Sequence, residues 1–185
     1  MVERGIIKEE EQELYQFGIR NGMILLLNVV TALVIGLLTE QLAVVAVFTL
    51  SFMVLRSYTG GYHSDSRIFC YLGSNLVLLV PVYTQAVFYK TSLARLLAVL
   101  LVSAGIIFLL SPMHSKNRKL DKEEQKHFGR KARLIAVLEL AVLGILWHAG
   151  QIPYAYAVYT GICITALFML IGKAQLWIQS HTENG

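Results

Sequence analysis

The hydrophobic positions of this chain fall into six long apolar runs, separated by short polar segments. The runs cover residues 23–38, 41–55, 71–88, 92–110, 134–148 and 154–171. A helix needs about 20 apolar residues to cross the hydrocarbon core of a bilayer, and several of these runs are shorter. We therefore expect an all-α polytopic membrane protein with about six transmembrane helices, some of them tilted or in locally thinned bilayer.

The segment 1–22, which precedes the first run, has a different pattern. It places apolar Ile6, Ile7, Leu14 and Phe17 at helical spacing between acidic residues. A secretory signal peptide begins with basic residues, so this acidic segment is a poor match to one. The pattern predicts an amphipathic N-terminal helix on the membrane surface, and the alternative is a solvated tail.

The composition supports a membrane protein. Hydrophobic residues make up 56% of the 185 positions and charged residues only 15%, where soluble domains carry about 25% charged residues. So apolar a chain lacks the polar side chains to cover a water-soluble globule. It has only two cysteines, Cys70 and Cys163, which excludes a disulfide scaffold. We expect one membrane-embedded domain over residues 1–185, with the lipid bilayer and not nucleic acid as its surroundings.

The placement of the basic residues predicts the orientation. If the N-terminus is cytoplasmic, 14 of the 16 Lys and Arg residues fall in cytoplasmic segments, and only Lys90 and Arg95 fall outside. Basic residues near the ends of spans are retained in the cytoplasm. Both termini, residues 56–70 and residues 111–133 are therefore expected at the cytoplasmic side of the cell membrane.

Residues 111–133, which we call the basic segment, are read here as a cytoplasmic loop with eight bases and three acids. Such a loop serves as an orientation signal that contacts lipid headgroups, or as a docking surface for an acidic peptide. The chain has no Walker loop, GxGxxG or HExxH motif, so nucleotide-driven transport and zinc proteolysis have no local support.

The most informative stretch is residues 56–70, RSYTGGYHSDSRIFC, which we call the catalytic segment. Its His63 and Cys70 are the residue types of a nucleophile–base pair, because an imidazole within reach raises the thiolate fraction of a cysteine. Gly60 and Gly61 break the helix, and they serve either as a turn or as backbone N–H donors near an oxyanion.

The spacing of His63 and Cys70 constrains the chain between them. Seven residues of straight helix separate two side chains by about 10 Å along the axis, too far for a hydrogen bond. The two residues can act together only if the chain bends at Ser64–Ser66. Asp65 could orient the imidazole, as the acid of a catalytic triad does, or could simply be a turn residue.

These residues resemble the accessory gene regulator B (AgrB) family, the membrane-embedded cysteine peptidases of Gram-positive quorum sensing. The family pattern is an arginine, a glycine pair, and a histidine and a cysteine seven residues apart. It is matched here at Arg56, Gly60, Gly61, His63 and Cys70. The chain length, the basic segment and the amphipathic N-terminus extend the resemblance over the whole chain.

The resemblance implies that Cys70 and His63 cleave the acidic C-terminal tail from an AgrD-like propeptide. Cys70 would hold the rest as a thioester until a Cys or Ser of the propeptide closes a thiolactone or lactone ring, giving an autoinducing peptide. No metal or other cofactor is needed, and a homodimer is implied by the resemblance alone. The acidic tail would be recognised by basic side chains of both segments, namely Arg56, Arg67, Lys116, Arg118 and Lys119.

Four further residues lie inside the apolar runs. Glu139 is either a functional carboxylate or a hydrogen-bonded structural group. Asn28 and Asn75 either join helices by hydrogen bonds or line a polar cavity beside Cys70. Cys163 is expected to be core filling.

The alternative to a peptidase is a membrane transporter or exporter of a small peptide, in which His63 and Cys70 are incidental. The number of apolar runs and the buried polar residues support that alternative. A non-catalytic scaffold would give no reason for the composition of the catalytic segment.

The expected orientation can be tested with single cysteines in a cysteine-free background, placed at Asn117 and at Gln151. An impermeant thiol reagent added to intact cells should label position 151 and not position 117, because only the basic segment is expected inside the cell. The reverse labelling would contradict the orientation.

Overall fold

The computed structural model describes residues 12–60, 67–113 and 122–182, and these residues form helices and no strands. The all-α prediction is therefore confirmed. Seven helices lie within the described ranges: α1 (Gln12–Leu38), α2 (Leu42–Thr59), α3 (Arg67–Tyr83), α4 (Gln85–Lys90), α5 (Leu93–Leu110), α6 (Lys122–His148) and α7 (Ile152–Thr182).

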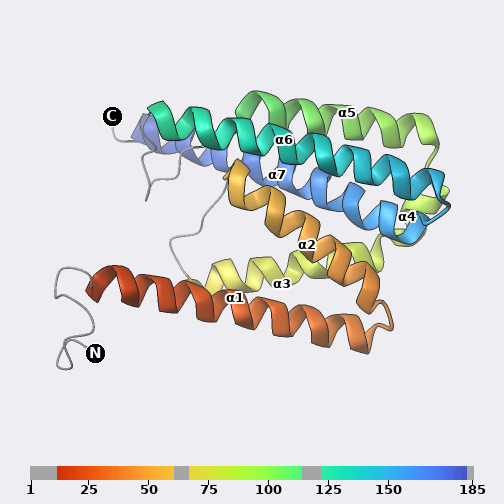
Figure 1. The fold of residues 1–185 in the computed structure, drawn as a ribbon, viewed down its shortest axis with the longest axis horizontal. Helices are drawn as coiled ribbons and strands as arrows, with labels where there is room; N and C mark the ends of the chain where they lie inside the picture. The colour runs from red at the N-terminus through yellow and green to blue at the C-terminus, as the bar shows by residue number, and fades with distance from the viewer. Residues whose placement is uncertain (1–11, 61–66, 114–121, 183–185) are drawn as a thin grey trace.

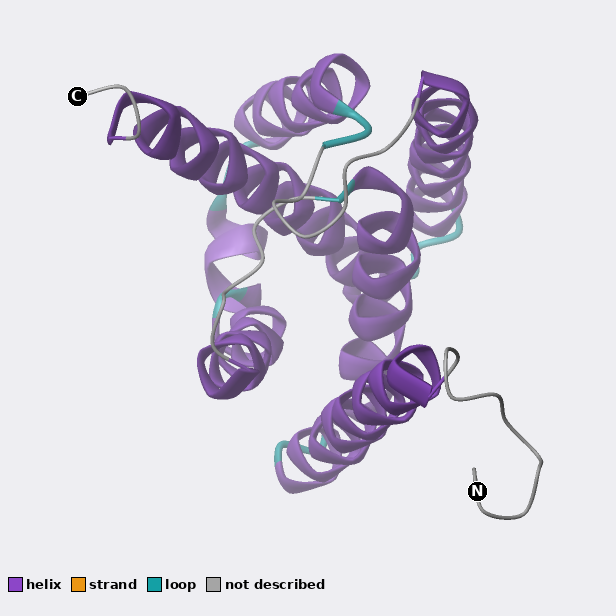
Figure 2. Ribbon diagram, turned by 90° about the vertical axis from the view of Figure 1, so that its left-hand side faces the viewer, coloured by secondary structure: helices purple, strands orange, loops and turns teal. Residues whose placement is uncertain are grey.

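The helices form two groups joined by α2 (Figure 1). One group contains α1 and α3, and the other contains α5, α6 and α7. The long helices alternate in direction along the chain, so α1 begins and α7 ends at the same end of the bundle. Figure 2 views the bundle from that end. The C-terminal ends of α2 and α5 and the N-terminal ends of α3 and α6 also lie there, and we call it the segment end.

Within the described ranges, three helical stretches are long and apolar enough to cross a bilayer: α2, α5 and residues Ile152–Ile178 of α7. Shorter apolar stretches occupy Gly22–Leu38 and Tyr71–Tyr83. These helices fit a membrane protein, while the count of about six spans remains a prediction.

Two of the expected segments have different boundaries in the structure. Helix α1 is continuous from Gln12 to Leu38, so residues 12–22 are an extension of the first apolar helix and not a separate surface helix. Residues 1–11 lie outside the described ranges. In the basic segment, residues 122–133 are not a loop but the first three turns of α6. Their Lys, Glu, Gln, Arg and Ala residues are strong helix formers, which explains this extension.

The apolar run at 71–88 is not one helix, because α3 ends at Tyr83 and α4 begins at Gln85. Pro81 lies in the last turn of α3 and has no N–H to continue the helical hydrogen bonds. Thr84 lies at the break, where its hydroxyl donates to the carbonyl of Val80 at 2.8 Å. The expected single span is therefore wrong at this point.

Helix α7 is the centre of the packing. It contacts α2, α3, α4, α5 and α6. In the apolar 18-residue part of its membrane-length stretch, 67% of the residues are buried within the protein, whereas only 17% of the residues of α5 are buried. Ile162 and Met169 of α7 pack with Leu55 of α2 and Ile107 of α5 in one core cluster. Helix α5 thus offers most of its surface to lipid, while α7 organises the core.

The closest approach in this core joins α2 to α7 and α6. A Cβ atom added to Gly161 would lie 2.6 Å from Oγ of Ser51, so a larger residue at this position of α7 would force the Ser51 side chain to move. The Ser51 hydroxyl in turn donates a 2.8 Å hydrogen bond to Oε2 of Glu139 in α6. Three helices therefore meet around one buried serine.

We expect Gly161→Ala to lower the free energy of unfolding by about 1–3 kcal/mol, because the methyl group overlaps Ser51 Oγ. Thermal unfolding in detergent micelles measures this change. Gly105→Ala is the matched control, since a Cβ at Gly105 of α5 meets nothing within 4 Å. The cost should be smaller in a Ser51→Ala background, where the overlapping oxygen is absent. Equal costs in both backgrounds would contradict this explanation.

Candidate functional site

The described helices bracket the catalytic segment. Helix α2 ends at Thr59, Arg67 is the first residue of α3, and Cys70 is its fourth. His63, Asp65 and Gly61 lie outside the described residues. The same holds for Lys116, Arg118 and Lys119 of the basic segment. The pairing of His63 with Cys70, the bend between them and the roles of these residues remain predictions.

Gly60 ends α2 in a conformation that suits only glycine. Its φ of 72° and ψ of −151° lie in a region that residues with a Cβ atom essentially do not occupy. Its N–H donates to the carbonyl of Arg56 at 3.2 Å. In the structure Gly60 therefore ends α2 within the catalytic segment.

The end of α2 is also bonded to the start of the basic segment. The N–H of Met113 donates to the carbonyl of Thr59 at 2.9 Å. A Cβ atom on Gly60 would lie 2.7 Å from the carbonyl oxygen of Met113. On the other side, a Cβ on Gly129 of α6 would lie 3.0 Å from Cδ of Pro112. Residues 111–113 therefore pack between α2 and α6. They connect the end of α2, in the catalytic segment, to the start of the basic segment.

The start of α3 is anchored on α1. The Thr31 hydroxyl donates to the carbonyl of Leu27 at 2.8 Å and lies 2.8 Å from the hydroxyl of Tyr71. Because the Thr31 hydrogen is already engaged, Tyr71 is the donor in the second hydrogen bond. Tyr71 follows Cys70 directly, so this bond sets the position of the first turn of α3.

Arg56 lies in the last turn of α2 and packs on two aromatic rings. Its guanidinium carbon is 4.7 Å from the ring centroid of Phe168 in α7 and 5.8 Å from that of Phe52. A guanidinium over aromatic faces is held in place by cation–π attraction. Sequence reasoning did not identify these two rings, because Phe168 is 112 positions away and looks like ordinary core.

A cavity of about 380 Å³ lies between α1, α2 and α3. Asn28 comes from α1, Arg56 and Ser57 come from α2, and Ser74 comes from α3; Gly60 also borders the cavity. The remaining lining residues are Leu25, Thr49, Phe52, Met53 and Leu78. Asn28 is among the residues that line this cavity, and its buried Oδ1 atom makes no hydrogen bond within the described part of the chain.

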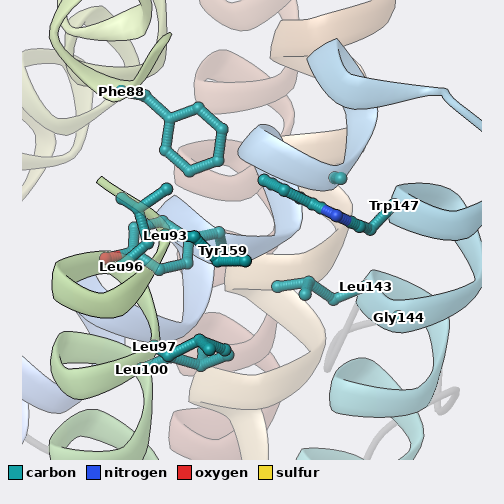
Figure 3. Close-up of a pocket in the computed structure, with 10 residues that line it drawn as sticks. Phe88, Leu93, Leu96, Leu97, Leu100, Leu143, Gly144, Trp147 and Tyr159 are labelled. Atoms are coloured by element: carbon teal, nitrogen blue, oxygen red, sulfur yellow. The ribbon is translucent and has the colours of Figure 1, made fainter. Parts of the chain in front are cut away.

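A second cavity, of about 280 Å³, lies at the other end of the bundle (Figure 3). Phe88, Leu93, Leu143, Trp147 and Tyr159 line it, together with further leucines, Gly144 and Ala155. Its walls are almost wholly apolar. It is formed by α4, α5, α6 and α7 and includes no residue of the catalytic segment, so we do not assign it to the same site.

The structure also shows the surroundings of the other residues inside the apolar runs. Glu139 accepts the hydrogen bond from Ser51, which favours its structural role. Oδ1 of Asn75 is buried and makes no hydrogen bond within the described part of the chain. Cys163 is a partly buried free thiol in α7, as expected for core filling. Among the described residues, no group of three or more His, Cys, Asp or Glu side chains is arranged to hold a metal ion.

Comparison with known proteins identifies one family. The sequence model of the family described as accessory gene regulator B matches residues 1–171. The chain is 25% identical over 134 residues to AgrB-like protein 2 of Clostridium perfringens strain 13, a match that covers 68% of this chain and 61% of that protein. It is 26% identical over 156 residues to accessory gene regulator protein B of Staphylococcus intermedius, with 82% and 80% covered. No solved structure gives a significant match.

The extent of these matches differs among the relatives. The chain spans about 61% of the length of two curated relatives from Clostridium perfringens. The family match, in contrast, includes the whole catalytic segment and the whole basic segment.

We expect Gly60→Ala to lower the free energy of unfolding by about 3 kcal/mol, since a Cβ atom is strained at this φ and meets the carbonyl of Met113. Gly73→Ala in α3 is the control, because a Cβ there meets nothing within 4 Å. Thermal unfolding of both variants in the same detergent gives the comparison. If Gly60→Ala unfolds at the wild-type temperature, neither the φ of Gly60 nor its close approach to the Met113 carbonyl requires glycine at this position.

Proposed function

The chain belongs to the accessory gene regulator B family, and from this membership we propose that it is a membrane cysteine endopeptidase that processes an AgrD-like propeptide. The family and the names of its relatives support a role in the agr quorum-sensing system. The observation that carries the finer proposal is the catalytic segment itself, a His and a Cys seven residues apart within the matched range.

In this proposal, the thiolate of Cys70 attacks the carbonyl carbon that precedes the acidic tail of the propeptide. His63 takes the thiol proton and returns it to the leaving nitrogen, so the peptide bond breaks and the tail departs as an amine. The remaining peptide stays on Cys70 as a thioester. A Cys or Ser side chain of the propeptide then displaces Cys70 and closes the ring.

The arrangement of the described residues supports this chemistry. Cys70 lies in the first turn of α3, which Tyr71 anchors to α1, and a nucleophile on an anchored element keeps its geometry through the reaction. The turn at Gly60 brings the chain out of α2 beside the start of the basic segment. The bases of that segment, with Arg56 and Arg67, are suited to an acidic tail, and no cofactor enters the reaction.

The ends of the helices and the placement of the basic residues indicate where the proposed site lies. The segment end holds the ends of α2, α3, α5 and α6 from which the catalytic and basic segments leave. With the basic residues on the cytoplasmic side, the site lies at the cytoplasmic edge of a multi-pass protein of the cell membrane. A site at this edge limits the water that competes for the thioester.

The proposal predicts that Cys70→Ala and His63→Ala each abolish propeptide cleavage, while Cys163→Ala retains it. Because the two residues act as one unit, the double variant should be no slower than either single one. The assay uses proteoliposomes with an AgrD-type propeptide, and cleavage is followed by mass spectrometry. Cys163→Ala is the matched control, since Cys163 lies in the packed helix α7.

The covalent intermediate gives a second and independent measurement. If the ring-closing Cys or Ser of the propeptide is replaced by Ala, a hydroxylamine-sensitive adduct should accumulate on Cys70. Attachment to another residue, or full cleavage by Cys70→Ala, would contradict the mechanism. Transport of the propeptide without cleavage would instead favour an exporter.

A further inference from the structure

The cavity in Figure 3 lies away from the segment end, between α4, α5, α6 and α7. Its 10 lining residues are all leucine, alanine, glycine or aromatic. Among these lining residues, the only polar side-chain groups are the indole N–H of Trp147 and the hydroxyl of Tyr159. A charged ligand, or one with several hydrogen-bonding groups, would give up its water there without gaining partners. The walls therefore select an apolar ligand.

An aromatic cluster holds the α4 end of this cavity in place. The ring centroid of Phe88 lies 4.9 Å from that of Tyr156, 5.3 Å from that of Tyr159 and 6.1 Å from that of Trp147. A hydrogen bond between the hydroxyls of Thr84 and Tyr156 also ties the start of α4 to α7. Because Phe88 is packed on rings from both α6 and α7, α4 does not collapse into the cavity, which keeps a volume of about 280 Å³.

Gly144 of α6 leaves one wall of the cavity open. A Cβ atom added to Gly144 meets nothing within 4 Å, so the packing of α6 against its neighbours does not require glycine there. Glycine is also a poor helix former. What the absence of a side chain does provide is space in the cavity wall, beside Leu143 and Trp147.

The cavity opens on the surface of α5 that faces lipid. Leu93 and Leu97 line the cavity and are nevertheless 53% and 48% exposed. On the α6 side of the opening, Trp147 is 38% exposed. Helix α5 is the most apolar of the three membrane-length stretches in the described ranges, and most of its residues are not buried. In a bilayer the molecules at this opening are the hydrocarbon chains of lipids.

We propose that this cavity holds part of one acyl chain of a membrane phospholipid, which enters between α5 and α6. An apolar cavity of about 150 Å³ in a protein core admits benzene, so about 280 Å³ has room for several methylene groups. Without a chain, the wall atoms would lack dispersion contacts on the cavity side. The inference goes beyond the proposed function, because no residue of the catalytic or basic segment lines this cavity.

The test uses the fluorescence of Trp147 in the full chain. The chain has two tryptophans, so Trp177→Phe leaves Trp147 as the single one. The protein is placed in vesicles of phosphatidylcholine that carries bromine atoms in one acyl chain, since bromine quenches an indole that it touches. We expect strong quenching by the brominated lipid and little quenching by iodide in the water. Stronger quenching by iodide would show a water-filled cavity and overturn the inference.

Two substitutions on different helices then fill the cavity or its opening. Gly144→Leu on α6 and Leu97→Phe on α5 should each lower the quenching by brominated lipid about twofold or more, because they leave no room for the chain. The matched controls are Gly105→Leu and Leu101→Phe on α5. Neither position is in the cavity wall; a Cβ at Gly105 meets nothing within 4 Å, and Leu101 is 71% exposed. Both controls should be quenched like the parent protein.

A count of bound lipid gives an independent measurement. In native mass spectrometry from detergent micelles, the parent protein and both controls should retain a single phosphatidylcholine per chain. Gly144→Leu and Leu97→Phe should lose it. This count separates a chain inside the cavity from lipid that only touches the exposed edge of Trp147, because lipid at the surface is removed by detergent.

The opposite outcomes are equally definite. Equal quenching and equal lipid retention in the filled variants and the controls would overturn the inference. Relief of the quenching by an AgrD-type propeptide would assign the cavity to an apolar peptide segment and overturn it as well. If Gly144→Leu does not fold, Leu97→Phe at the opening decides the matter. None of these measurements depends on propeptide cleavage, so failure of this inference is distinct from failure of the proposed function.

Discussion

The close approach of α2 to α7 at Ser51 and Gly161 is the contact on which the arrangement of this protein depends. Glycine at position 161 lets the two helices meet, and the Ser51 hydroxyl binds Glu139 of α6 from the same place. In lipid, where helices gain little from hydrophobic burial, small residues and interhelical hydrogen bonds drive association. This contact therefore sets where α2 lies, and α2 is the helix that joins the two groups of the bundle.

The position of α2 determines the geometry of the site. Its last turn holds Arg56 on the ring of Phe168 in α7, and its end at Thr59 is bonded to Met113. The catalytic segment leaves from Gly60, beside the point where the basic segment begins. A contact deep in the bundle thus places the two segments that, in our proposal, cut the propeptide and recognise its tail.

The two cavities differ in the polarity of their walls. The cavity at the segment end has Asn28, Ser57 and Ser74 among its polar lining residues. The one in Figure 3 is enclosed by leucines and by Phe88, Trp147 and Tyr159. The more polar cavity is the one whose wall includes Arg56 and Gly60 of the catalytic segment.

The sequence by itself determined the helical class, the apolar runs and the residues with chemistry, because hydrophobic periodicity and a short motif are local properties. It predicted Cys70 and Gly60 as parts of one segment, but it missed the break at Thr84 and the helical start of the basic segment. Only the tertiary structure decided that Glu139 binds Ser51, that Phe168 holds Arg56 and that Asn28 faces a cavity with Ser74. The two contacts join residues 88 and 112 positions apart, the cavity is lined by residues of three helices, and packing between helices leaves no periodic signal along the chain.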